Sequence, residues 1–263
     1  MKSKISKYIE DKNTRGEKIL SVFLTSGFPE KDNFVELALD VLDAGADILE
    51  IGFPFSDPIA DGPIIQQSSQ AALRDGINLI KTLNYVKEIN KHTDKPIILM
   101  GYANPLLSYG LEKFADDSKR IGVDGLIVPD IPLDEYDNFF TSKFDGTDII
   151  LLITPTTPTD KIKMIDEKSS GFIYCVSVTG TTGIQKTAST DNLQFIKNAY
   201  EQCTNNKVLV GFGISSVEDV KYYKPYCDGV IVGSAVIKSL MNDDSKYQKT
   251  LTLVRNLKSG LID

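Results

Sequence analysis

The chain has 263 residues, of which 41% are apolar and 25% charged. This composition is typical of a folded protein with a buried core and excludes a chain that is mainly disordered. The formal net charge is -7, so the backbone of a nucleic acid and an anionic membrane are repelled on average. No stretch approaches the roughly 18 apolar residues needed to cross a bilayer. We therefore expect neither a nucleic-acid nor a membrane partner, and any anionic ligand must be bound by a local site.

Cysteine and histidine are scarce. The chain has Cys175, Cys203 and Cys227, with no Cys-x-x-Cys pair, and its single histidine, His92, is far from them in sequence. This pattern predicts neither a metal site nor a disulfide framework. The first 13 residues contain lysines but no apolar run behind them, unlike a secretory signal. We expect a reducing, cytoplasmic location, no metal, and a solvated or helix-capping His92.

Short β-rich apolar runs recur along the chain, and segments with helical spacing separate them. Runs that are apolar on both faces, each followed by an amphipathic helix, predict an α/β fold with a closed parallel sheet, the (β/α)8 TIM barrel. No linker interrupts residues 1–263, so one domain is expected. The eight runs cover residues 19–24, 46–51, 96–101, 123–128, 147–153, 171–176, 207–212 and 227–232. The clearest helical faces are Phe34, Leu37, Ala38, Val41 and Leu42, and Leu79, Leu83, Val86 and Ile89.

An open flavodoxin-like or Rossmann-like sheet is the alternative. Such a sheet needs fewer strands and often carries a glycine-rich loop after its first strand. Here that loop reads LTSGFPE, and neither G-x-G-x-x-G nor the P-loop motif occurs in the chain. The barrel is favoured, and it predicts that active residues lie where the strands end, contributed by several strands.

The second run, ADILEI, carries Glu50. Strand alternation places Ile48 and Glu50 on one side, and Asp47, Leu49 and Ile51 on the other. A carboxyl group among aliphatic side chains is poorly solvated, which raises its pKa and suits it to exchange protons near neutral pH. Glu50 is therefore a candidate acid or base. A carboxylate paired with a lysine or a backbone donor remains the alternative.

Asp61 follows in the loop after this run, two residues before Pro63. Two carboxyl groups on one active-site loop allow one to cycle a proton while the other stays ionised. Asp61 is equally interpreted as an N-cap of the helix that the proline begins. The same loop holds a stiff, partly apolar stretch that suits contact with a partner protein or packing on its own barrel rim: Pro54, Phe55, Asp57 and Pro58.

Glycines follow the last two runs. Gly211 and Gly213 allow close approach to a ligand, while Gly233 and Ser234 offer backbone N–H groups at the start of a helix. The loops after strands 7 and 8 often form the phosphate site of such barrels, so an anion site is predicted there. Tight turns alone are the alternative explanation of the glycines.

Other polar and aromatic residues lie at strand ends. Residues 177–190 form a polar loop that is either a lid over the site or an ordinary solvated connection. Tyr174, before that loop, is expected to pack in the core. Tyr102 and Asp130 are weak single candidates. Phe23 and Phe212 are candidate apolar walls of a pocket, or core residues.

Six motifs, LEIGFPFSDPIADGP, GYANP, VPDIP, YCVSVTGTTG, GFGIS and VGSAV, occur in the order and spacing of the tryptophan synthase α family, which the whole chain resembles. The resemblance implies that Glu50 and Asp61 are catalytic and that Tyr174 lies near the reacting groups. It implies phosphate binding at Gly183, Gly213, Gly233 and Ser234. It places Phe23, Tyr102, Asp130, Thr182 and Phe212 at pocket or supporting positions.

The resemblance further implies cofactor-free retro-aldol cleavage of a phosphorylated substrate, indole-3-glycerol phosphate, and a β subunit as partner in an α2β2 tetramer. The chain departs from many relatives at Phe28, where they carry Asp, and at Val178, where some carry Arg. Both departures bear on lid closure and on communication with the partner. The alternatives are a non-catalytic activator of the β subunit, a stand-alone indole-releasing lyase and an indole-glycerol-phosphate synthase. The sequence has no lysine at a strand position suited to a Schiff base, which argues against a lysine-dependent aldolase.

Overall fold

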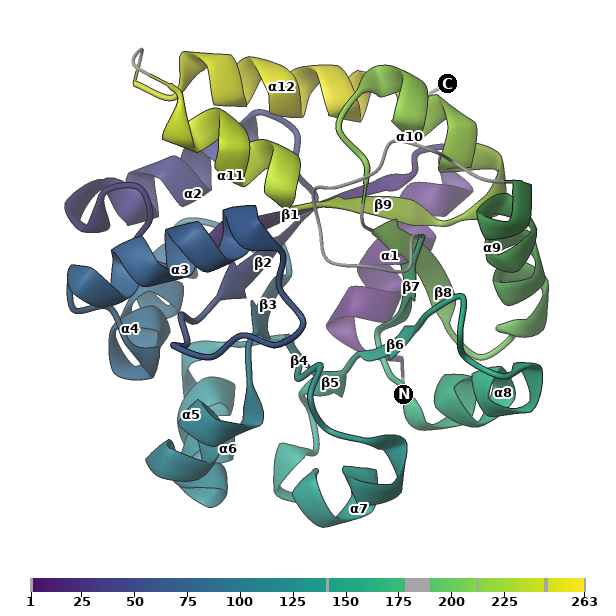
Figure 1. Ribbon diagram of the computed structural model, residues 1–263, viewed down its shortest axis with the longest axis horizontal. Coiled ribbons are helices and arrows are strands. Elements are labelled where there is room, and N and C mark those ends of the chain that lie inside the picture. The colour runs from purple at the N-terminus through teal and green to yellow at the C-terminus, as the bar shows by residue number, and fades with distance from the viewer. Residues whose placement is uncertain (1, 141, 178–189, 212, 244–245, 263) are drawn as a thin grey trace.

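Parallel strands form the centre of the molecule (Figure 1). The computed structural model describes residues 2–140, 142–177, 190–211, 213–243 and 246–262. The strands make one sheet in the order β5-β4-β3-β2-β1-β9-β8-β7-β6, and every neighbouring pair is parallel. They are β1 (Ile19–Thr25), β2 (Ile48–Gly52), β3 (Ile97–Met100), β4 (Gly125–Ile127), β5 (Asp148–Ile149), β6 (Leu151–Ile153), β7 (Phe172–Val176), β8 (Lys207–Gly211) and β9 (Gly229–Val232).

The two ends of this order, β5 and β6, are halves of one chain segment. β5 pairs with β4, β6 pairs with β7, and the backbone N–H of Ile150 between them donates to the carbonyl of Leu126 at 3.0 Å. The segment thus joins both edges of the sheet, which confirms the predicted (β/α)8 barrel. The apolar run 147–153 is interrupted where it passes from one neighbouring strand to the other, an interruption that its composition does not reveal.

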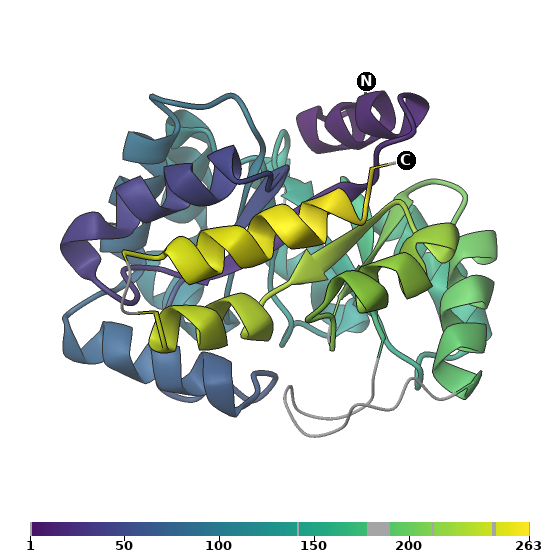
Figure 2. The ribbon, with the colours of Figure 1, turned by 90° about the horizontal axis from the view of Figure 1, so that it is seen from above.

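Helices surround the barrel (Figure 2). The predicted apolar faces of α2 and α4 are buried, as expected from their spacing. In the described part of the chain, no helix has the length and apolar character needed to cross a membrane. The helices outside the barrel are α2 (Phe34–Asp43), α3 (Pro63–Arg74), α4 (Leu79–Ile89), α5 (Ala103–Tyr109), α6 (Leu111–Ile121), α7 (Tyr136–Phe139), α8 (Thr159–Lys168), α9 (Thr190–Gln202), α10 (Val217–Tyr223), α11 (Ser234–Met241) and α12 (Gln248–Ser259). Short 3-10 helices cover Lys31–Asn33, Leu133–Glu135, Ser142–Phe144 and Lys224–Tyr226.

Helix α1 (Lys4–Thr14) covers the end of the barrel where the strands begin (Figures 1 and 2). The hydroxyl of Ser3 accepts a hydrogen bond from the N–H of Ser6 and caps the helix at its start. Ile5 and Ile9 are fully buried against the aliphatic residues that fill the barrel interior. Because α1 fills this end, the opposite end is left for a site.

Aspartates at the beginnings of strands tie neighbouring strands together at the α1 end. Asp47, Asp124 and Asp228 each accept the backbone N–H of the neighbouring strand, from Leu20, Ile97 and Val208 respectively, at 2.9–3.0 Å. Lysines lie beside these aspartates: Lys258 Nζ is 2.6 Å from Asp47, and Lys4 Nζ is 2.9 Å from Asp124. Lys258 lies near the end of α12, so its ion pair fastens the last helix to the second strand.

We expect Lys258→Met to destabilise the fold by about 3 kcal/mol, near the low end for a broken buried ion pair. Asp47 is 3% exposed and would lose its closest cation, but it keeps Lys12 at 3.5 Å and the N–H of Leu20. Urea unfolding measures the effect. The control is Lys91→Met, which breaks an exposed pair with Glu88 and should change stability by less than about 1 kcal/mol. Equal losses in the two variants would contradict the role of the buried pair.

Candidate active site

Glu50 lies inside the barrel, as strand alternation predicts. Ile48 belongs to the interior cluster, whereas Leu49 and Ile51 pack in the outer core between strands and helices. The side chain of Glu50 is 0% exposed. Its neighbours across the sheet are Phe23 on β1 and Ile98 on β3.

One oxygen of the Glu50 carboxyl group is held and the other is not. The hydroxyl of Ser21 donates to Oε1 at 2.7 Å, while Oε2 is buried and has no hydrogen-bond partner among the described residues. Burial raises the pKa of Glu50 from 4.5 to about 7, and the hydrogen bond from Ser21 acts in the opposite direction. Glu50 can thus gain or lose a proton near neutral pH. Ser21 was not among the predicted site residues, because the sequence marks it only as a polar residue on the inward face of the run ILSVFL.

Asp61 is not a helix cap. Helix α3 begins at Pro63, and its N-cap residue is Gly62, so Asp61 lies one residue before the cap position. The carboxyl group of Asp61 is instead hydrogen-bonded to Tyr102, the residue that ends the loop after β3. Burial raises the pKa of Asp61 to about 6, and the bond from Tyr102 moderates the rise.

Tyr102 connects this loop to its neighbour. Its hydroxyl accepts the N–H of Ala60 at 3.0 Å and bonds to Asp61, and burial followed by the charge of Asp61 raises its own pKa. Asp130, after β4, accepts the N–H of Ala103 with both oxygens, at 3.0 and 3.2 Å. Asp130 therefore fixes the first residue of α5, directly after Tyr102, and supports the site from a second position.

Tyr174 faces the same space from β7, which stands opposite β2 in the strand order. It is 5% exposed and packs on Gly211 of β8, where a Cβ atom would lie 2.5 Å from the tyrosine hydroxyl. Its pKa is raised by burial and then by the charges of Glu50 and Asp61. The structure therefore brings Tyr174 together with both carboxyl groups, whereas its sequence context had predicted only a core residue.

Two helices begin on the rim after β8 and β9. The start of α10 is occupied by its own capping box, in which Ser216 and Asp219 bond each other's backbone. Helix α11 begins at Ser234 after Gly233, which has no side chain to cap the helix. Because N–H groups at a helix start attract anions, the α11 end suits a phosphate better than the α10 end. Gly213, with φ +79°, lies exposed between β8 and α10.

Phe23 lies beside this rim and forms an apolar wall. A Cβ on Gly233 would lie 3.3 Å from the Cβ of Phe23, and the ring of Phe23 occupies the space that a side chain on Gly52 would need. Both glycines therefore admit the ring. Thr182, Gly183 and Phe212, with Val178, lie outside the described residues. Phe28, the other departure from many relatives, is 8% exposed and packs in the outer core.

The loop after β2 packs partly on its own rim. The ring of Phe55 lies 5.4 Å from that of Tyr102, and Pro54 is buried. Asp57 is exposed, Pro58 is partly buried, and Ile59 beside them is 79% exposed. An exposed isoleucine next to a held aromatic ring leaves an apolar contact surface, so neither interpretation of this loop excludes the other.

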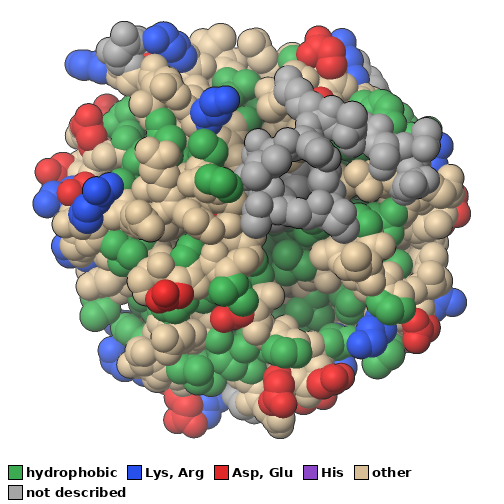
Figure 3. All heavy atoms as spheres, in the orientation of Figure 1, with side chains coloured by type: hydrophobic (Ala, Val, Ile, Leu, Met, Phe, Trp, Pro, Cys, Tyr) green, Lys and Arg blue, Asp and Glu red, His purple; other side chains and the backbone are tan. Residues whose placement is uncertain are grey.

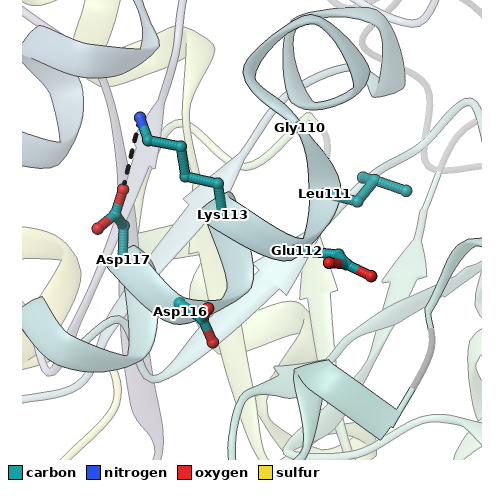
Figure 4. A pocket seen from close by; sticks show the side chains of 6 residues that line it. All are labelled: Gly110, Leu111, Glu112, Lys113, Asp116 and Asp117. Carbon is teal, nitrogen blue, oxygen red and sulfur yellow. Dashed lines mark ion pairs between the residues drawn. The ribbon is translucent and has the colours of Figure 1, made fainter.

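Figure 3 views the barrel from the end opposite α1, where the surface is hollowed near its centre and hydrophobic side chains line the hollow. A second hollow lies on the outside, where α5 meets α6 (Figure 4). There Lys113 pairs with Asp117 at 3.8 Å, and none of the predicted site residues takes part. Its lining residues are Gly110, Leu111, Glu112, Lys113, Asp116 and Asp117.

The remaining predictions concern metals and thiols. In the described ranges, no group of three or more His, Cys, Asp or Glu side chains could hold a metal ion. All three cysteines are buried as free thiols. His92 is exposed three residues after α4 ends, in agreement with the predicted solvated position.

Comparisons with known proteins agree along the full chain. A family model described as Tryptophan synthase alpha chain matches residues 9–261. The tryptophan synthase alpha chain of Thermoanaerobacter sp. (strain X514) is 38% identical over 264 residues, covering 98% of this chain and 100% of the relative. A solved structure from Aquifex aeolicus VF5 has a TM-score of 0.90 and 36% identity, covering 99% of this chain and 100% of the other. Tryptophan synthase from Mycobacterium tuberculosis has a TM-score of 0.90 and 30% identity, covering 99% of each chain.

Buried Glu50 should make stability depend on pH. Because its pKa is raised when folded, the folded protein keeps a proton between about pH 4.5 and 7 that the unfolded chain has lost. Stability therefore falls as pH rises through this window. Gln does not ionise and so avoids the cost of burying a charged carboxylate. Glu50→Gln should therefore be more stable than wild type at pH 8 by up to about 3 kcal/mol, and this difference in stability should become small towards pH 5.

Urea unfolding at pH 5, 6, 7 and 8 measures this difference. Glu36→Gln is the control, because Glu36 is exposed on α2 and its replacement should give a difference that does not grow with pH. A Glu50→Gln variant that is less stable than wild type at pH 8 would refute the desolvation of Glu50.

Proposed function

The chain belongs to the tryptophan synthase alpha chain family, and from that premise we propose that it is a carbon–carbon lyase that cleaves indole-3-glycerol phosphate to indole and glyceraldehyde 3-phosphate without a cofactor. The observation that carries the proposal is the meeting of Glu50, Asp61 and Tyr174 inside one barrel end. Two carboxyl groups with pKa values of about 7 and 6 allow one to hold a proton while the other is ionised.

The reaction begins with Glu50 protonated. Its proton passes to C3 of the indole ring, and the positive charge that appears on the ring is stabilised by ionised Asp61 at the ring N–H. The bond between C3 and the side-chain carbon then breaks, and its electron pair returns to the ring. The adjacent hydroxyl loses its proton to Glu50 and becomes the aldehyde. Glu50 ends in the form in which it began, so no redox partner or cofactor is needed.

The phosphate would bind at the start of α11. Gly233 and Ser234 supply N–H groups and a hydroxyl there, with Gly213 and Gly183 completing the site. Phe23 and Phe212 would form apolar walls, while Tyr102, Asp130 and Thr182 support the pocket. Tyr174 would contact the reacting end of the substrate. This assignment places the phosphate on the rim and the indole over the interior carboxyl groups.

A β subunit is the proposed partner, in an α2β2 assembly. The proposed contact is the loop with Pro54, Phe55, Asp57 and Pro58, next to exposed Ile59. We further propose that residues 1–263 act as one domain and that the protein works in the cytoplasm, where its three buried thiols remain reduced.

Three other functions each explain part of the structure. A non-catalytic activator of the β subunit would use the exposed loop but not a pair of desolvated carboxyl groups. A stand-alone indole-releasing lyase, or an indole-glycerol-phosphate synthase, would use the phosphate site without the loop. Assaying indole release with and without the β subunit separates these functions from the proposed one.

We expect Glu50→Gln to reduce indole release by about a hundred- to ten-thousand-fold, the range for removal of a general acid or base. Asp61→Asn should also reduce kcat, because a neutral amide stabilises the ring cation less. Substrate binding should remain detectable in both variants by calorimetry. Turnover of Glu50→Gln within a few-fold of wild type would exclude Glu50 as the acid, and absence of indole release by the wild-type complex would favour the activator.

The pH profile of kcat/KM should be bell-shaped, with limbs near pH 6 and 7, because Asp61 must be ionised and Glu50 protonated. The second ionisation of a substrate phosphate also falls near pH 6, so the alkaline limb gives the stricter test. The rate should fall about tenfold per pH unit above pH 8. A rate that continues to rise up to pH 9 would show that ionised Glu50 starts the reaction.

A further inference from the structure

Ser21 is a polar residue in an otherwise apolar part of the barrel. It is fully buried on β1 and pairs with Ile48 on β2 and Ile231 on β9. Its hydroxyl donates to Glu50 Oε1 at 2.7 Å. The direct neighbour of Glu50 on β1 is Phe23, so Ser21 contacts Glu50 diagonally, from two residues earlier on the strand. The strand register of β1 and β2 therefore brings the Ser21 and Glu50 side chains within hydrogen-bond distance.

The surroundings of Glu50 make the two carboxyl oxygens different. Oε1 accepts the serine hydroxyl, whereas Oε2 is buried with no hydrogen-bond partner in the part of the chain that the structure describes. The neighbour of Glu50 on β3 is Ile98, and β8 contributes Leu209 to the same interior. Tyr174 from β7 is the titratable group nearby, because its pKa is raised by burial and then by the charges of Glu50 and of Asp61 in the loop after β2.

We propose that Ser21 is a positioning residue for the acid–base step, which fixes Oε1 of Glu50 and leaves Oε2 as the oxygen that carries the proton to and from the substrate. This inference rests on the proposed function. A hydroxyl that donates to Oε1 disfavours a proton on that same atom, so the acidic hydrogen of protonated Glu50 lies on Oε2. With one oxygen anchored, the carboxyl group cannot rotate freely, and the proton keeps one direction through both transfers.

Ser21 also acts on the equilibrium of Glu50. A donor to a carboxylate stabilises its ionised form, so the serine opposes the effect of burial and keeps the pKa of Glu50 close to neutral. A carboxyl group that is too hard to ionise would give its proton to C3 only with difficulty. One hydrogen bond from Ser21 therefore both orients the carboxyl group of Glu50 and eases the release of its proton.

The test is Ser21→Ala in the complex with the β subunit. We expect kcat to fall about tenfold with KM within about twofold, and the alkaline limb of kcat to move up by about one pH unit, as for loss of a hydrogen bond to a charged group. A merely structural serine would lower stability without moving that limb. An unmoved limb would overturn the proposal. If Ser21→Ala does not fold, Ser21→Cys tests the same contact, because a thiol is a weak donor of similar size.

Two control variants define the effect. Ser21→Thr retains the hydroxyl and should keep the alkaline limb at its wild-type position. Ser118→Ala removes another fully buried serine hydroxyl, which donates to the carbonyl of Ala115 on the outer helix α6, and should not move the limb. A shift of equal size in Ser118→Ala would assign the change to general loosening of the fold and overturn the proposal.

A second readout does not need activity. Infrared titration of the ligand-free chain, with Glu50→Gln subtracted, follows the protonated carboxyl group of Glu50 directly. Ser21→Ala should raise its midpoint by about one pH unit. If the midpoint moves but wild type releases no indole, the proposed function fails and the link between Ser21 and Glu50 stands. If Glu50→Gln abolishes indole release but Ser21→Ala moves neither readout, the function stands and the role of Ser21 fails.

Discussion

The site depends on the desolvation of one carboxyl group. Glu50 is fully buried inside a closed sheet, and among the described residues a single hydroxyl donates to one of its two oxygens. Desolvation makes the neutral form favourable near pH 7, and this gives the barrel an acid at a pH where an exposed glutamate would be fully ionised. Closure of the barrel through the segment around Ile150, and the plug formed by α1, maintain that exclusion of water from the other end. The closed barrel and α1 together keep the carboxyl group of Glu50 away from solvent.

Close packing of aromatic rings on glycines shapes the space around this group. Gly52 admits the ring of Phe23, and Gly211 admits that of Tyr174, each where a Cβ atom would occupy the same volume. Rings brought so close to the backbone narrow the interior without filling its open end. Tyr174 reaches the carboxyl groups from the opposite strand by this means. A site that looks like a gap in the core is therefore built by the same packing that stabilises the core.

Much of this architecture could be predicted from local pattern, and the rest depended on contacts between distant segments. Period-two alternation placed Glu50 inward, and helical spacing identified the buried faces of α2 and α4, because both follow from backbone geometry. The interruption at Ile150 and the contact from Ser21 to Glu50 depend on strand register, which no single run encodes. Asp61 was ambiguous because a proline two residues later is equally typical of a capped helix; the phenol of Tyr102, 41 residues further along the chain, decides between the two interpretations. The resemblance to a family supplied the substrate and the separate roles of the carboxyl groups, which physical chemistry alone left open.

The carboxyl groups at the two ends of β2 differ in how many hydrogen-bond and ion-pair donors surround them. Asp47, directly before the strand, is buried to 3% exposure but receives the ammonium of Lys258 and the N–H of Leu20, so its charge is matched by donors. Glu50, three residues later, is buried more completely, and from the described part of the chain it receives one neutral hydroxyl. The donors around Asp47 stabilise its charge and hold the last helix on the strand. Glu50 has too few donors to stabilise its charge, so it exchanges its proton near neutral pH, and the protein is less stable for it. Asp47 and Glu50 lie three positions apart in one chain segment, so the ion pair and the hydrogen bond at Asp47 stabilise the strand that carries Glu50. This stabilisation offsets the cost of burying a carboxyl group that has few hydrogen-bond donors.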